Sequence, residues 1–194
     1  QAINTHPDMV AYVVGECLRV GAAEVIVSSH DARRGFVANG TAGAVERAGG
    51  RLEILETMDQ FRAVPIPRGR LLGEEHIATS LIEADVFINM PIAKHHRGSI
   101  VTLTLKNLMG VIARPNQFHK NLHQRIADLT SLVRPALTVV DAVRILTAHG
   151  PGGGNLADVE KLDTVIASPD IVTADAYACT FFGKTADDIP YVKL

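Results

Sequence analysis

The segment DVFINMPIAKHHRGSIVTLTLKNLMG, residues 85–110, indicates both the fold class of this chain and the place of a site. Its apolar start, residues 86–88, is typical of a strand covered on both faces, and similar runs occur at 25–27 and 138–140. Stretches with a helical pattern separate these runs. Strands that alternate with helices predict an α/β fold, a three-layer Rossmann-like sandwich around a mostly parallel central sheet.

The other elements follow from apolar periodicity and from the residues that begin and end helices. Pro7 suits an early helical position and Gly21 a C-terminal stop, which predicts a helix over 7–21. The patterns further predict strands at 23–29, 51–56, 85–91, 136–143 and 162–168, an extended piece at 62–69, and helices at 35–50, 73–84, 103–113, 119–133 and 170–183.

Composition limits the classes of protein to consider. A length of 194 residues with 47% hydrophobic content suits a single domain with a sizeable core. The 19 basic and 21 acidic side chains nearly balance, which predicts no nucleic-acid partner and requires a local cluster to bind any anionic ligand. No apolar run approaches the roughly 20 residues of a membrane span.

The chain begins at Gln1, without a Met and without a signal-like segment. We therefore expect a processed protein or a fragment. The expectation is one α/β domain over 1–194 that is truncated at its N-terminus and could also be truncated at its C-terminus.

The two cysteines, Cys17 and Cys179, lie far apart in the sequence, and neither belongs to a CxxC pair. A four-cysteine iron–sulfur or zinc site within this chain is therefore not expected. Both cysteines sit in apolar helical contexts, which predicts buried free thiols.

Polar clusters follow the predicted strands, as in SSHDARR after 23–29, AKHHRG after 85–91 and SPD after 162–168. In open α/β sheets, ligands bind beyond the carboxyl ends of the strands, so parallel strands would bring these clusters to one rim. The cluster in the second segment includes adjacent histidines, His95 and His96. In an extended segment they point in opposite directions, so we expect only one of them to face a given cavity.

Charged residues in apolar surroundings are further candidates. Lys94 and Lys106 would supply positive charge for a carboxylate or phosphate. Lys106 lies in an apolar helical pattern, where a buried ammonium is costly unless it is paired; it is either a nucleophile or ligand anchor, or a surface residue whose stem lies along the protein. Asp141 ends a buried strand and Asp175 lies in an apolar helix, so both carboxylates demand partners.

Two further motifs leave alternatives open. His119 and His123 form an i, i+4 pair that would share one face of a helix, either as metal ligands or as solvated residues. The loop GPGGGN, residues 150–155, lacks the Lys-Ser/Thr of a phosphate-binding loop. It is either a plain surface loop or a place where backbone can approach a ligand.

The segments EADVFINMPIAKHH, TLTLKNLMGVI, VRPALTVVDAVRIL and VIASPDIVTADAYACTFFG together resemble the domain of unknown function 362 family of bacteria and archaea. The hallmarks of that family are INxPxxKxH followed by TxxxKNxxG. The resemblance covers nearly the whole chain. It implies as functional positions Asn89, Lys94, His96, Thr102, Lys106, Asn107, Asp141, Asp170 and Asp175.

The family implies no settled activity. Many members are linked to ferredoxin-type iron–sulfur modules, which implies such a module as a partner, and some have twin-arginine leaders, so the compartment is either the cytoplasm or an exported location. Members usually begin with a strand that would precede Gln1. A remote likeness to nickel-pincer lactate racemases rests on the ten-residue spacing of His96 and Lys106. It implies a metal role for His119 or His123.

These observations predict a site in which His96, Lys106 and Asp141 carry the chemistry, and Asn89, Lys94, Thr102, Asn107 and Asp175 bind the ligand. The first candidate function is an enzyme or redox-associated protein that takes a small anionic ligand, with no cofactor identified. The second is a non-catalytic module that binds an acidic small molecule or partner. A third interpretation is that Asn89, Thr102 and Asn107 only satisfy backbone groups in a tight crossover.

Overall fold

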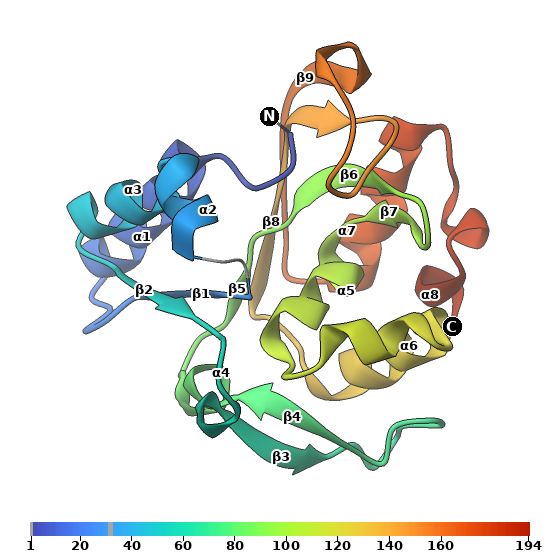
Figure 1. Cartoon of the computed structure of the whole chain (residues 1–194), viewed down its shortest axis with the longest axis horizontal. Helices are drawn as coiled ribbons and strands as arrows, with labels where there is room; N and C mark the ends of the chain where they lie inside the picture. The colour runs from blue at the N-terminus through green and yellow to red at the C-terminus, as the bar shows by residue number, and fades with distance from the viewer. Residues whose placement is uncertain (1, 31–32) are drawn as a thin grey trace.

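The computed structural model describes residues 2–30 and 33–194 and has an α/β fold (Figure 1). Its main sheet has five strands, with β8 (Leu137–Leu146) in a central position. On one edge, β8 pairs in parallel with β5 (Ile88–Asn89) and then with β6 (Ile92–His96). On the other edge it pairs antiparallel with β9 (Val159–Ser168).

The predicted parallel pairing is found among β5, β6 and β8, and these strands form the centre of the sheet. The two outer strands run antiparallel to their neighbours. β7 (Ile100–Thr102) turns back on β6, and β9 turns back on β8. Both connections lack a crossover helix, and such connections join antiparallel strands. As a consequence, the SPD segment after β9 lies beside the beginning of β8, because Ser168 pairs with Thr138. It does not reach the predicted rim.

Two smaller sheets complete the strands. β1 (Ile26–Ser29) pairs in parallel with β2 (Arg51–Ile54), whereas β3 (Phe61–Pro65) and β4 (Glu74–Ala78) form an antiparallel pair. The strands predicted near 23–29, 51–56, 85–91, 136–143 and 162–168 are all present.

Helices lie on both sides of β8, as a three-layer arrangement requires (Figure 1). One group is close to β1 and β2 and comprises α1 (Pro7–Arg19), α2 (Arg33–Ala38) and α3 (Thr41–Arg47). The other comprises α5 (Thr104–Asn107), α6 (Leu122–Leu132), α7 (Ile171–Ala178) and α8 (Pro190–Lys193). The remaining helical turns are α4 (Thr79–Glu83), η1 (Met58–Gln60), η2 (Leu108–Val111), η3 (Pro115–His119), η4 (Leu156–Asp158), η5 (Cys179–Phe182) and η6 (Ala186–Asp188).

Three predicted helices are corrected. The prediction for 73–84 was wrong in its first half, because Glu74–Ala78 folds back on β3 and cross-strand pairing outweighs the local pattern. The helix at 35–50 is interrupted at Gly40, which has φ +87°. The helix at 119–133 begins only at Leu122, because Asn121 adopts a left-handed conformation with φ 63°.

The main core lies between the sheet and the second helix group. Leu103, Leu105 and Phe118 are buried in it together with Val140 and Ala142 of β8. Since side chains alternate across a strand, the residue between the last two, Asp141, points to the opposite face of β8. Among the described residues, no helix combines the length and apolarity needed to cross a membrane.

Candidate functional site

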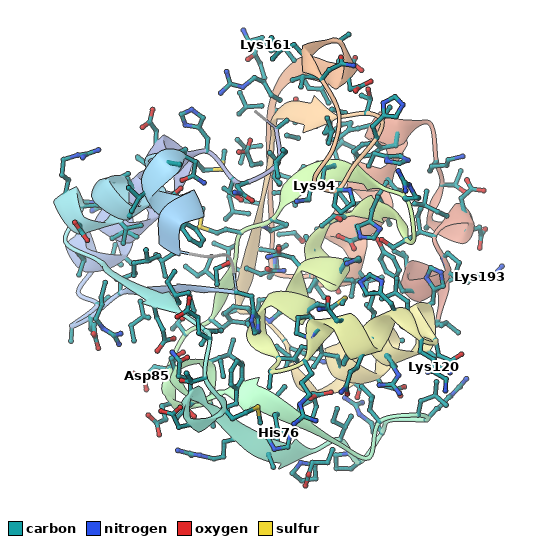
Figure 2. All side chains as sticks on the ribbon, in the orientation of Figure 1. His76, Asp85, Lys94, Lys120, Lys161 and Lys193 are labelled. Atoms are coloured by element: carbon teal, nitrogen blue, oxygen red, sulfur yellow. The ribbon has the colours of Figure 1, made fainter. Side chains whose placement is uncertain are left out.

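The candidate site begins on β6, which carries Lys94, His95 and His96 on the strand itself. The sequence placed these residues in a loop beyond a strand. Instead, the chain resumes pairing after Pro91, whose carbonyl accepts a hydrogen bond from the Asp141 N–H at 2.8 Å. Lys94 lies beside β6 in the middle of the molecule as drawn, whereas Lys120 lies at its outline (Figure 2).

A short helix, α5, carries Lys106, and a buried carboxylate fixes its beginning. Asp175 of α7 is fully buried. Its Oδ1 accepts the Thr104 N–H at 2.6 Å, and its Oδ2 accepts the Leu105 N–H at 3.1 Å. The Thr104 hydroxyl also contacts this carboxylate and donates to the Ile171 carbonyl at 2.8 Å. Asp175 therefore satisfies backbone donors that a helix leaves unpaired at its N-terminus.

Two asparagines hold the same helix to the sheet. The Asn89 amide donates to the Thr104 carbonyl at 2.8 Å, and its Oδ1 accepts from the Asn107 amide, also at 2.8 Å. Thr102 is buried and pairs with Lys94 across β6 and β7. The contacts of Asn89, Asn107 and Asp175 thus hold α5 in position.

Lys106 is buried without an acidic partner. It is 9% exposed, and its Nζ contacts the Met109 Sδ at 3.5 Å, a weak acceptor. No ion pair within 2–30 and 33–194 includes it. Burial, and then repulsion from Lys94, lowers the pKa of Lys106 to about 8. The surroundings of Lys106 therefore disfavour its ammonium form.

His96 is buried, at 7% exposure, with one ring nitrogen already occupied. Its Nδ1 accepts the N–H groups of Gly98 at 3.0 Å and Ser99 at 3.2 Å. An acceptor at Nδ1 leaves the proton of the neutral ring on Nε2. His96 therefore offers a hydrogen-bond donor to its surroundings even when it is uncharged.

Burial, and then neighbouring charges, suppress the charge of His96. The ring of His119 stacks on it with centroids 6.2 Å apart. Burial lowers the pKa of His96 to about 4, and repulsion from Lys106, His119, Lys94 and His95 contributes in that order. We call these residues, Lys94, His95, His96, Lys106 and His119, the cationic cluster. They come from β6, α5 and η3.

The glycine-rich loop packs against the cationic cluster. The Gly150 N–H donates to the His95 Nδ1 at 3.1 Å, and the Gly150 carbonyl accepts the Arg97 N–H at 3.3 Å. A Cβ at position 150 would lie 1.9 Å from the His95 carbonyl oxygen, so glycine is needed for this approach. His95, like His96, consequently presents Nε2–H when neutral.

The hydrogen bonds of Asp141 lead to backbone groups near the N-terminal segment and not to Lys106 or His96. Its Oδ2 accepts the His6 N–H at 2.8 Å and its Oδ1 accepts the Val143 N–H at 3.1 Å. It borders a cavity of about 20 Å³ that is also lined by His6 and Arg144. Asp141 lies on the face of β8 opposite the main core, to which Leu105 and Leu108 beside Lys106 belong. Residue spacing alone does not reveal which face a strand residue occupies.

His119 and His123 do not share a helix face. His119 ends η3, whereas His123 lies in α6 and stacks on Tyr191 with centroids 5.8 Å apart. Across the described parts of the chain, no group of three or more His, Cys, Asp or Glu side chains is arranged to hold a metal ion. Cys17 is partly buried, and Cys179 is buried; both are free thiols. The contact of His119 with His96 had no signal in the sequence.

Comparison with known proteins gives two matches. The chain is 24% identical over 153 residues to a thylakoid-associated protein from Synechocystis sp. (strain ATCC 27184 / PCC 6803 / Kazusa). This alignment covers 70% of the chain and 46% of that protein, so the chain spans less than half of its relative's length. The model of the family described as a domain of unknown function, DUF362, matches residues 1–180. The chain therefore belongs to the DUF362 family.

Proposed function

We propose that the protein binds a small anion, a carboxylate or a phosphate, at the cationic cluster. The observation that carries this proposal is the burial of Lys106 without a carboxylate partner among the described residues, next to His96, whose pKa is lowered to about 4. Like charges repel strongly where water is scarce. An anionic ligand bound among these side chains would offset that repulsion and would pair with the Lys106 ammonium.

The histidine tautomers also favour an anion. His95 and His96 each accept backbone N–H groups at Nδ1, so the neutral ring of each carries its proton on Nε2. Because adjacent residues of β6 point to opposite faces, we assign to the anion only His96, whose ring stacks on His119. A metal ion needs a lone pair at that nitrogen, whereas a carboxylate or phosphate oxygen needs a donor. A histidine with its proton on Nε2 therefore suits direct contact with an oxyanion better than coordination of a metal ion.

The pH dependence of binding follows from the pKa of Lys106. A bound anion stabilises the ammonium and raises that pKa above its free value of about 8. Above pH 8 the free protein must take up a proton in order to bind. We therefore expect the affinity to fall by about tenfold between about pH 7 and about pH 9.

Isothermal titration calorimetry with sodium phosphate and sodium lactate tests the proposal, with sodium chloride as the salt control. Wild-type protein and Lys120→Met, which removes an exposed lysine, should bind one of the two anions with equal affinity. Lys106→Met should lose at least about tenfold in affinity, as expected for a charge-assisted contact. Binding that Lys106→Met leaves unchanged, or no binding of either anion, would contradict the proposal.

A further inference from the structure

Lys106 is more buried than anion binding alone requires. An exposed lysine binds a carboxylate without the desolvation that burial imposes. Lys106 instead follows the fully buried Leu105 and precedes the fully buried Leu108, and its Nζ meets the thioether of Met109. These surroundings favour the uncharged amine over the ammonium.

The uncharged amine is a nucleophile. With a pKa of about 8 in the free protein, roughly a tenth of Lys106 is uncharged at pH 7; this uncharged fraction is the reactive form, whereas the ammonium is the form that binds a non-reacting anion. An ordinary lysine, with a pKa near 10.4, has a few hundred-fold less amine at that pH. A lysine desolvated beside another cation is activated toward carbonyl compounds in this way. The cation in this case is Lys94.

His96 supplies the complementary group. Its neutral ring keeps a proton on Nε2, because Gly98 and Ser99 donate to Nδ1. A neutral imidazole that donates from a fixed nitrogen polarises a carbonyl without transferring its proton. The cationic cluster therefore combines an amine, an electrophilic hydrogen-bond donor and further positive charge for a carboxylate.

We propose that the anion is a 2-oxo carboxylate and that Lys106 condenses with its carbonyl group to form a Schiff base, a proposal that rests on the anion site above. The Nζ lone pair attacks the carbonyl carbon while the carbonyl oxygen accepts a hydrogen bond from His96 Nε2–H. The carbinolamine then loses its hydroxyl with the proton from Nζ as water. One amine and one 2-oxo acid give one Schiff base and one water, and no oxidant or reductant is consumed.

Reductive trapping tests this chemistry. The protein is incubated with pyruvate as the probe, reduced with sodium borohydride, and analysed by intact mass spectrometry and peptide mapping. Wild-type protein and Lys120→Met should each gain one reduced pyruvate, and the peptide map should place it on Lys106. Lys106→Arg keeps a positive charge but removes the amine, and should gain none. The trapping rate should rise with pH up to about 8, as the amine loses its proton.

Two results separate this inference from the proposed function. If lactate binds in calorimetry but pyruvate is not trapped on Lys106, the Schiff base is contradicted and the anion site stands. If neither anion binding nor trapping occurs, the proposed function fails as well. Trapping spread over exposed lysines such as Lys120 and Lys161 also overturns the Schiff base, because it shows no selective activation.

Discussion

Lys106→Met is expected to raise the free energy of unfolding at neutral pH by up to about 3 kcal/mol while anion binding is lost. The native fold lowers the pKa of Lys106 from 10.5 to about 8, so the folded protein holds this proton less tightly than the unfolded chain does. Methionine keeps an apolar stem of similar length and removes the charge. If the proposed function is correct, both effects come from the same feature, the burial of the Lys106 ammonium.

The pH dependence identifies the cause. In the wild type, the cost of the buried ammonium is complete below about pH 8, and stability should rise with pH between about 8 and 10.5 as the native lysine loses its proton first. The advantage of Lys106→Met should therefore disappear above about pH 10.5. Urea unfolding of both proteins at neutral and alkaline pH measures this difference.

Lys106→Ala is the companion variant. It removes the charge and the stem, so it should bind no anion yet be less stable than Lys106→Met by about 2 kcal/mol, through the cavity it leaves. Equal stability of the wild type and Lys106→Met at neutral pH, with anion binding retained, would mean that Lys106 reaches solvent along its stem. The functional reading of the site would then rest on His96 alone.

Asp175→Ala is expected to lower the free energy of unfolding by about 3–5 kcal/mol. The change removes the acceptor of the Thr104 and Leu105 N–H groups, both in the buried interior, and leaves a void in α7. Because these contacts fix the start of α5, anion binding through Lys106 should weaken as well. Asp187→Ala, at an exposed aspartate, is the control and should change stability by less than about 0.5 kcal/mol.

The pH dependence of stability separates the charge of Asp175 from its hydrogen bonds. Burial raises the pKa of Asp175 to about 7, although the Thr104 and Leu105 donors oppose this rise. Its stabilising effect is therefore complete below its unfolded pKa of 3.8 and is lost as the pH rises through about 7. Asp175→Asn should abolish this decline in urea unfolding between about pH 4 and pH 8. A wild-type profile that is flat in this range would contradict the raised pKa.

The strands of the fold were predictable because short apolar, β-branched runs mark them in the local sequence, although only the run at 138–140 is buried throughout. The apolar runs at 25–27, 86–88 and 138–140 fall within or beside β1, β5 and β8. β6 was missed because its polar residues are matched by distant parts of the chain. The Lys94 Nζ donates to the Ile3 carbonyl at 2.6 Å, 91 residues away. The sequence of β6 alone therefore resembles a loop.

The candidate site, like the fold, was predictable from the sequence only in part. The apolar helical pattern around Lys106 left open whether this lysine is buried or reaches solvent along its stem, and the structure buries it. The contact of Asp175 with Thr104 joins residues 71 positions apart, and Asp141 faces away because of the face of β8 on which it falls. The stacking of His119 on His96 joins side chains from two separate elements, η3 and β6. These features follow from tertiary packing and have no local pattern.

Titration of His96 by NMR tests the electrostatic account of the cationic cluster. Its resonance, assigned with a His96→Gln variant, should give a pKa of about 4 in the free protein. Saturating phosphate or lactate should raise this pKa, because an anion stabilises the imidazolium, and Lys106→Met should raise it in part by removing one repelling charge. A His96 pKa near 6.5 that neither an anion nor Lys106→Met changes would contradict the existence of the anion site.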